Sequence, residues 1–496
     1  MLCGGALTLW SALAVAFFSS RGWLLYSGDA EAHLDIARRM VDSRTPGYEQ
    51  VGTAWLPLEH WLTVPFAGVD AWWQSGIAGA IPSAVCFVVA GCFLFAAARR
   101  IFQSAAAAWT ATALVALNPN LLYLQSTAMT EAVFYACLAG LLYFTVRFRE
   151  NQSWPSVIGA GLAACAGTLT RYEGWFLLPF AAVYFLWAAQ RRRIAVAAVF
   201  CLIAGLGPLF WLAHNWWLGG DPLAFYRGPY SARAIQGDAP YPGRGDWAKA
   251  VLFFRTAVEL CCGMGLVLAA MGGLAAALFK RAFWPLVLLA LPGAFLVWSV
   301  HSGAVPIFVP SLWFGSSYNT RYGLAVLPFL ALAAAGLVAV TPPGKARAVM
   351  AVLAIAAGSG HWLAHRQPQD WTVWQESSVN DQARREAVRE AAEFLGAHYA
   401  RGTGIFTSFG MVTAIYRELG IPLRDTFTGD NGLAWDAAAA RPELVLREPW
   451  AVALAGDAAE AAILHAGSYR LEKSILVKGA REIRIYRRAG ENRDSS

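Results

Sequence analysis

The chain has 496 residues, of which 57% are hydrophobic and only 14% are charged, with 22 tryptophans and a formal net charge of +7. Soluble proteins carry about 25% charged residues, so this composition excludes an ordinary soluble protein and indicates a polytopic membrane protein. The excess of basic residues lies in the apolar part of the chain, and this location fits loops that contact anionic lipid. The sequence contains no nucleic-acid-binding motif.

Charged residues are unevenly distributed along the chain. Residues 365–496 carry 17 of the 39 Lys and Arg residues and 18 of the 32 Asp and Glu residues. We therefore expect an α-helical membrane domain over residues 1–364 and a small soluble α/β domain over residues 365–496. All eight cysteines lie in apolar stretches, so neither a disulfide framework nor a zinc site is predicted.

Apolar runs near the roughly 20 residues that cross a bilayer predict about eleven membrane-spanning helices. The first run has no basic residues before it, which favours an uncleaved helix over a signal peptide. The predicted spans are residues 4–25, 76–98, 103–124, 130–147, 155–171, 174–190, 194–217, 249–279, 282–300, 322–341 and 347–364.

Clusters of basic residues occur on short loops at alternate ends of these spans. Because cytoplasmic loops are enriched in Lys and Arg, we assign these loops to the inner face. The loops at about 26–75, 218–248 and 301–321 and the C-terminal domain then face the outside. The Ala- and Arg-rich composition indicates a bacterial inner membrane, for which the outside is the periplasm, and the endoplasmic reticulum is the alternative. Chemistry there cannot use cytoplasmic nucleotide sugars or ATP. The basic clusters are Arg99/Arg100, Arg147/Arg149, Arg191 to Arg193, Lys280/Arg281 and Lys345/Arg347.

The segment GDAEAHLDIARRM, at the start of the first outer loop, places Asp29, Glu31 and His33 within five positions. Carboxylates in a first helical turn suit the helix macrodipole, yet a carboxylate at a membrane exit could also accept a proton from a substrate. The apolar positions that follow predict an amphipathic helix lying flat at the interface, with Arg38 and Arg39 reaching the headgroups. His33 and Asp29 could share a divalent metal, although a lone surface histidine is more common.

Charges at a membrane boundary cost about 2.5 kcal/mol or more each, so they are candidates for function. Glu131, in TAMTEAVF, either completes a helix cap with Thr127 or lines a site. In TRYEGW, Arg171 and Glu173 are expected to form a boundary ion pair. Arg171 and Tyr172 are also candidate substrate-binding residues.

Arg321 follows an outer loop with no other charge at 302–320 and directly precedes a span. With Tyr318 and Asn319 it could bind a phosphate at headgroup depth, or it could simply snorkel. The loop at 218–248 is rich in Gly, Pro and Tyr and is expected to act as a gate. Further candidate binding residues on the outer face are Trp55, His60, Asp221 and Tyr226.

The C-terminal residues show the alternating pattern of a small α/β domain. DQARREAVREAAEFLGAHY and MVTAIYREL predict helices, and GIFTSF, SILV and EIRIYRR predict strands. The sequence there has no phosphate loop, nucleophile elbow or metal cluster. We therefore expect acceptor recognition or support of a lid, with packing alone as an equal alternative.

The layout over about residues 1–364 resembles the GT-C superfamily of membrane glycosyltransferases, which includes protein O-mannosyltransferases and the aminoarabinose transferases of lipid A. SGDAEAHL resembles the acidic motif of the first outer loop, which implies that Asp29 is the catalytic base and Glu31 the second carboxylate. NTRYGLAVLP resembles a basic late-loop segment, with Arg321 as ligand of the lipid phosphate, and MTEAVF resembles a boundary acidic position at Glu131. The motif here is D-x-E, whereas many relatives have adjacent D-E, so it leaves open which carboxylate is the base.

The resemblance implies transfer of a sugar from a polyprenyl-phosphate donor to an acceptor glycan, lipid or protein, with inversion at the anomeric carbon. A carboxylate that takes the proton of the acceptor hydroxyl contributes roughly 10²- to 10⁴-fold. A cation stabilises the charge that develops on the leaving phosphate. A metal is optional for a monophosphate leaving group, and the sequence offers no clean set of ligands.

Other classes of function remain as alternatives. A metal-dependent transferase with a pyrophosphate-lipid oligosaccharide donor would bind a divalent cation through outer carboxylates and His33 or His60. A lipid or sugar transporter would need polar or broken helices near the midplane and internal repeats, which the sequence does not show. A non-catalytic structural protein is the last alternative.

Overall fold

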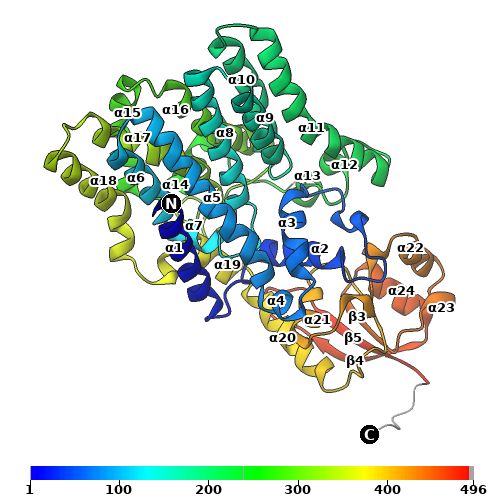
Figure 1. Ribbon diagram of the computed structural model, residues 1–496. Helices are drawn as coiled ribbons and strands as arrows, with labels where there is room; N and C mark the ends of the chain where they lie inside the picture. Colours follow the sequence, from blue (N-terminus) through cyan, green and yellow to red (C-terminus); the bar gives the residue numbers. More distant parts are fainter. Residues whose placement is uncertain (1, 238, 491–496) are drawn as a thin grey trace. The chain divides into compact units, whose positions relative to one another are not determined.

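The computed structural model describes residues 2–237 and 239–490 and is mostly helical (Figure 1). It divides into two compact units, each built from separate stretches of chain. The helical unit comprises Met1–Arg21, Gly52–Glu59 and Ala80–Glu376. The sheet unit comprises Gly22–Val51, His60–Gly79 and Ser377–Ser496. Most of the predicted first outer loop therefore belongs to the same unit as the C-terminal residues. The domain boundary predicted at residue 365 assigns these two parts of the chain to different domains.

Within the described residues, seven helices are long and apolar enough to cross a membrane, or eight if one bent pair counts as a single span. The bent pair is α14 (Trp247–Cys262) and α15 (Met264–Phe279), which meet at Gly263 with a bend of 105°. The run predicted as one span at 249–279 is therefore not a straight helix. The seven helices are α1 (Leu2–Ser19), α5 (Ile77–Phe102), α8 (Glu131–Asn151), α11 (Arg193–Gly219), α16 (Phe283–Ser302), η2 (Thr320–Val326) continued by α17 (Leu327–Val340), and α18 (Lys345–Ala364).

The apolar run at 103–124 forms two short helices, α6 (Ala105–Ala116) and α7 (Pro119–Leu124). The side chain of Asn118 caps α7, and Pro119 occupies its first turn, where the missing N–H costs nothing. A hydropathy pattern detects the apolar run but not the cap inside it. This run is therefore not a single membrane-spanning helix.

Two other predicted spans also correspond to shorter helices. The runs at 155–171 and 174–190 form α9 (Trp154–Thr168) and α10 (Glu173–Ala188), which have 15 and 16 residues. The count of eleven spans stays a prediction. The remaining helices of the helical unit are α12 (Ala224–Arg227), α13 (Ala232–Gln236), η3 (Pro368–Asp370) and α19 (Thr372–Asn380). The last residues of α19 belong to the sheet unit.

The sheet unit is built around a five-stranded sheet of order β2-β1-β3-β5-β4 (Figure 1). β1 pairs in parallel with β2 and β3, whereas β5 is antiparallel to β3 and β4. The segments predicted as strands overlap β1, β4 and β5. The strands are β1 (Ile405–Thr407), β2 (Thr426–Phe427), β3 (Trp450–Leu454), β4 (Tyr469–Ile475) and β5 (Ile483–Arg488).

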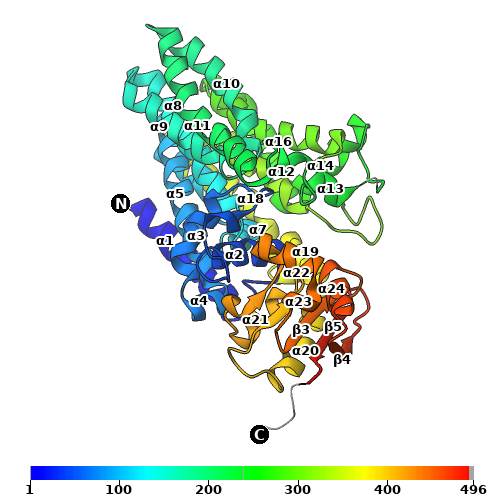
Figure 2. The same ribbon diagram turned by 90° about the vertical axis from the view of Figure 1, so that its right-hand side faces the viewer.

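The helices of the sheet unit include both helices predicted in the C-terminal part, α20 (Gln382–Gly396) and α21 (Thr413–Leu419). α20 is amphipathic and buries Val388 and Leu395 on one side. The other helices are α2 (Gly28–Arg39), η1 (Tyr48–Val51), α3 (Leu58–Ala67), α4 (Asp70–Ser75), η4 (Leu423–Asp425), η5 (Gly429–Asn431), α22 (Leu433–Ala440), α23 (Pro442–Val445) and α24 (Ala458–Ala466) (Figures 1 and 2).

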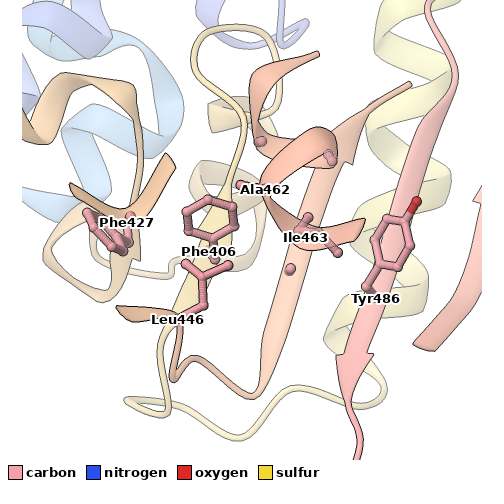
Figure 3. Packing of buried hydrophobic residues seen from close by; sticks show 10 residues of the cluster. Phe406, Phe427, Leu446, Ala462, Ile463 and Tyr486 are labelled. Atoms are coloured by element: carbon pink, nitrogen blue, oxygen red, sulfur yellow. The ribbon is translucent and has the colours of Figure 1, made fainter. Parts of the chain in front are cut away.

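One face of the sheet is covered by a cluster of buried apolar side chains (Figure 3). Phe406 of β1 stacks on Trp435 of α22 with ring centroids 5.0 Å apart, and Ala462 of α24 belongs to the same cluster. Because successive strand residues point to opposite faces, β3 contributes the alternate residues Ala451 and Ala453. This packing gives the sheet unit a fixed core.

Candidate functional site

The two carboxylates predicted for catalysis lie in the first turn of α2 and have different surroundings. Asp29 is half-buried, whereas Glu31 is buried with 5% of its surface exposed. Glu31 forms ion pairs with Arg384 at the start of α20 and with Arg417 on α21. Each oxygen of the Glu31 carboxylate therefore already has a guanidinium partner.

The surroundings of Glu31 change its acidity. Burial raises the pKa of its carboxyl, but the guanidinium groups of Arg417 and Arg384 outweigh this effect and hold the pKa below its ordinary value. A carboxylate with a lowered pKa is a weaker proton acceptor. The structure thus distinguishes two residues that the D-x-E motif leaves equivalent, because Glu31 is an ion-pair partner and Asp29 is the more accessible carboxylate.

The rest of α2 is buried inside the sheet unit. Leu34 has no exposed surface, and Arg38 is 2% exposed and pairs with Asp42 at 2.6 Å. Arg39 pairs with Asp430 at 2.9 Å. The prediction of an interfacial helix whose arginines reach the headgroups is therefore wrong, because an apolar helical stripe suits a protein core as well as a membrane surface.

His60 lies in the interior rather than on an exposed loop. Its Nε2 is 2.8 Å from Nδ1 of His33, and both side chains are buried. Burial, together with the neighbouring His33 and Arg39, keeps the pKa of His60 well below its ordinary value, so the imidazole is neutral near pH 7. Neutral imidazoles are ligands for divalent metals, so this histidine pair is where a metal-dependent enzyme would hold its ion.

The second group of predicted residues forms a buried ion cluster in the helical unit, made of Glu131, Arg171, Glu173 and Arg321. Arg171 Nη2 lies 2.8 Å from Glu173 Oε1, and Arg171 Nη1 lies 3.1 Å from Glu131 Oε1. Arg321 Nε lies 3.4 Å from the same oxygen of Glu131. Both guanidinium groups also lie over the ring of Tyr322, at 5.2 and 5.3 Å. Two positive and two negative charges thus compensate one another, with both carboxylates buried and both arginines partly exposed.

Helix ends place the two carboxylates of this ion cluster. Glu131 and Glu173 are the first residues of α8 and α10, where the helix macrodipole favours a negative charge. The predicted helix cap involving Thr127 does not form, because its hydroxyl donates to the Leu124 carbonyl at 2.7 Å. Glu131 therefore acts as a counter-ion, and the ion pair predicted between Arg171 and Glu173 is present.

Tyr318 and Asn319 precede Arg321 and make contacts within their own loop, and their role in phosphate binding stays a prediction. Tyr318 is 48% exposed, and its backbone pairs with Phe308. Asn319 is buried and donates through Nδ2 to the Pro306 carbonyl at 2.9 Å. Asn319 therefore holds the loop together.

Glu376, on α19, is a candidate residue that sequence reasoning missed. Its buried carboxylate accepts hydrogen bonds from the backbone N–H groups of Asn319 at 2.8 Å and Thr320 at 3.1 Å. It also accepts from the hydroxyls of Thr320 and of Ser317, the latter at 3.2 Å. Glu376 thus fixes the turn that immediately precedes Arg321. No sequence signal identifies it, since it lies in an ordinary helix 55 residues further along the chain.

Tyr172 belongs to aromatic packing in the helical unit. The hydroxyl of Tyr172 donates to the Ala54 carbonyl at 3.2 Å and accepts from Trp211 Nε1 at 3.2 Å, and its ring stacks on Phe225. Trp55 is partly buried in the stretch just before α3. These contacts explain the position of Tyr172 without a ligand.

Asp221 and Tyr226 lie on the loop predicted as a gate, which contains α12 and α13. Asp221 Oδ1 accepts from the N–H of Leu223 at 2.9 Å, and Tyr226 is 47% exposed with the Arg233 guanidinium 5.7 Å from its ring centroid. Asp221 therefore shapes the turn, and a gating role for this loop stays a prediction.

The chain resembles known proteins in part of its sequence and in its fold. The family model of dolichyl-phosphate-mannose-protein mannosyltransferases matches residues 61–217, and no curated protein matches the chain in sequence. The crystal structure of ArnT from Cupriavidus metallidurans bound to undecaprenyl phosphate superposes with a TM-score of 0.55 and 14% identity, covering 96% of this chain and 98% of that one. The apo structure of the same protein gives a TM-score of 0.54 and 14% identity, with coverage of 97% and 98%. Over residues 61–217 the chain is therefore similar to the mannosyltransferase family, and over nearly its whole length it shares the fold of ArnT.

Proposed function

We propose that the chain is an inverting glycosyltransferase that moves a sugar from a polyprenyl-phosphate donor to an acceptor hydroxyl on the outer face of a bacterial inner membrane. The observation that carries this proposal is the buried ion cluster, in which Arg321 stands at the start of the apolar segment Thr320–Val340. A cation at the end of a membrane-spanning helix is placed to meet a lipid phosphate. ArnT, which shares the fold, was crystallised with undecaprenyl phosphate bound.

In the proposed reaction Arg321 stabilises the charge that develops on the leaving lipid phosphate. Its guanidinium has five N–H donors in a planar fork, so the contact between Nε and Glu131 is compatible with donation to phosphate oxygens. Arg171 is held more closely, between Glu131 and Glu173, and shares the negative charge of Glu131. Glu131 thus orients Arg321 while it shares its charge with Arg171.

Asp29 is the proposed general base. It takes the proton of the acceptor hydroxyl while the acceptor oxygen attacks the anomeric carbon and the bond from that carbon to the phosphate oxygen breaks. This displacement needs one base and one stabiliser of the leaving group. Because both oxygens of Glu31 are paired with arginines, Asp29 is the carboxylate better placed to accept the proton.

A metal-dependent transferase with a pyrophosphate-linked donor is the second candidate, and the buried pair of His33 and His60 favours it. The two candidates differ in their response to chelation. With a polyprenyl-monophosphate sugar as donor, we expect transfer by the purified protein to stay within about twofold after EDTA treatment, since no metal is needed to stabilise a monophosphate leaving group. Loss of transfer that Mn²⁺ or Mg²⁺ restores, or activity with the pyrophosphate-linked donor only, would favour the second candidate.

Glu376→Ala is expected to raise the KM for the lipid donor by about tenfold, because displacement of a binding group by a fraction of an ångström weakens its contacts. Its carboxylate holds the backbone of Asn319 and Thr320, and without it Arg321 loses its fixed position. Steady-state kinetics at varied donor concentration measure the effect. Glu376→Gln, which keeps one acceptor oxygen, should be intermediate, and Glu150→Ala, at an exposed ion pair, should match the wild type. A change in kcat alone would contradict this role.

A further inference from the structure

A row of ion pairs attaches residues 28–50, including α2, to the C-terminal α/β part of the sheet unit. Four of the nine side chains in these pairs are buried and three are partly buried, and the partners lie more than 350 residues apart in the sequence. The pairs are Glu31 with Arg384 and Arg417, Arg39 with Asp430, Asp42 with Arg424, and Arg44 with Glu448.

A hydrogen bond and one of these ion pairs lie on either side of the proposed base in the sequence. The backbone N–H of Gly28 donates to Asp381 Oδ2 at 2.9 Å, and Asp381 in turn pairs with Arg384 at 3.1 Å. On the other side, the carboxylate of Glu31 is held by Arg384. The first turn of α2 is therefore fixed immediately before and two residues after Asp29.

Stability alone does not account for the ion pair between Glu31 and Arg417. Both side chains are only 6% exposed, so forming the pair requires removing two charges from water. Replacing a buried ion pair by apolar residues is often neutral or stabilising, whereas the pair fixes geometry. A general base requires fixed geometry, since a displacement of about 1 Å can cost 10²-fold in rate.

The end of α2 lies at the edge of the sheet where ligands usually bind. In open α/β sheets, ligands bind at the carboxyl ends of parallel strands where the strand order reverses, and β1 lies at such a point between β2 and β3. Phe409 follows β1 and Asp430 follows β2. Arg39, at the end of α2, pairs with Asp430, and its guanidinium lies 4.9 Å from the ring centroid of Phe409.

We infer that the C-terminal α/β part holds the first turn of α2 in place for catalysis, with Arg384 and Arg417 as positioning residues for Asp29. This inference rests on the proposed function, in which Asp29 is the base. It gives the α/β part a role in the rate of transfer.

The test uses the full chain in detergent or nanodiscs with a polyprenyl-phosphate sugar donor. Arg417→Ala is expected to lower kcat by about 10- to 100-fold with the donor KM unchanged. Hydrogen exchange should increase in residues 28–36 of the same variant, which reports the freed turn directly. Glu31→Gln should also lower kcat and leave the donor KM unchanged. Arg417→Lys should recover part of kcat. The matched control is Arg470→Ala, which removes an exposed arginine of the same sheet unit.

Normal kcat in a folded Arg417→Ala protein would overturn the inference, as would a lower kcat without faster exchange in residues 28–36. Should Arg417→Ala fail to fold, Glu31→Gln and Arg417→Lys decide in the same way by kcat and exchange. Asp29→Asn separates this inference from the proposed function. Full activity of Asp29→Asn removes the proposed base, whereas an inactive Asp29→Asn beside a fully active Arg417→Ala removes the positioning role alone.

Discussion

Asp29→Asn is expected to abolish sugar transfer and to leave binding of the lipid donor nearly intact. The substitution preserves the size and polarity of the side chain but removes the proton acceptor. A lost general base costs roughly 10²- to 10⁴-fold in rate. Single-turnover transfer from a polyprenyl-phosphate sugar measures the chemical step, and equilibrium binding of the same donor measures its affinity.

A carboxylate outside the proposed site supplies the control for this prediction. Asp436 is exposed on α22, and Asp436→Asn should transfer at the wild-type rate. Turnover of Asp29→Asn at the wild-type rate would show that Asp29 is not the base. Glu31 is held by two arginines. Its replacement should therefore lower the rate of transfer as much as Arg417→Ala does, and less than Asp29→Asn does.

The long apolar helices were predictable from sequence because each one carries its signal within itself. The spans predicted at 76–98 and 194–217 correspond to α5 (Ile77–Phe102) and α11 (Arg193–Gly219). Hydropathy reports burial in an apolar environment, which holds along the whole of such helices. It fails where a cap or a bend interrupts the run, as at Asn118 and at Gly263.

The partners of the charged residues could not be predicted from sequence patterns. Arg321 and Glu131 stand out because charges at membrane boundaries are costly, yet nothing in either segment indicates that they meet across 190 positions. The same holds for Glu31, whose partner Arg417 is 386 positions away. Choosing between Asp29 and Glu31 as the base depends on these partners, so the D-x-E motif alone cannot make that choice.

α2 was assigned to a membrane interface for a related reason. A helix with an apolar stripe and terminal arginines has the same pattern whether its stripe faces lipid or protein. The structure supplies Asp42 and Asp430 as partners for the two arginines, so the helix is buried in the sheet unit. Only long-range contacts distinguish these two environments.

Arg321→Ala is expected to weaken binding of the lipid donor by about 10- to 100-fold. A charge-assisted hydrogen bond contributes about 1.5–3 kcal/mol, and each 1.4 kcal/mol is about tenfold in affinity. The fold should tolerate the change, because Glu131 keeps its ion pair with Arg171 at 3.1 Å and is not left as an uncompensated buried charge. Arg321→Lys should recover only part of the affinity, since an ammonium lacks the planar fork that matches phosphate.

Equilibrium binding of a polyprenyl phosphate without its sugar isolates this effect from catalysis. Arg255→Ala is the matched control, because Arg255 is an exposed arginine of α14 in the same helical unit and pairs only with Glu259 among the contacts described. Donor affinity of Arg321→Ala equal to that of Arg255→Ala would leave Arg321 as a structural partner of Glu131 and would remove the proposed phosphate ligand. Loss of thermal stability in Arg321→Ala with unchanged donor affinity would lead to the same conclusion, because it would show that the charge supports the ion cluster and not the donor.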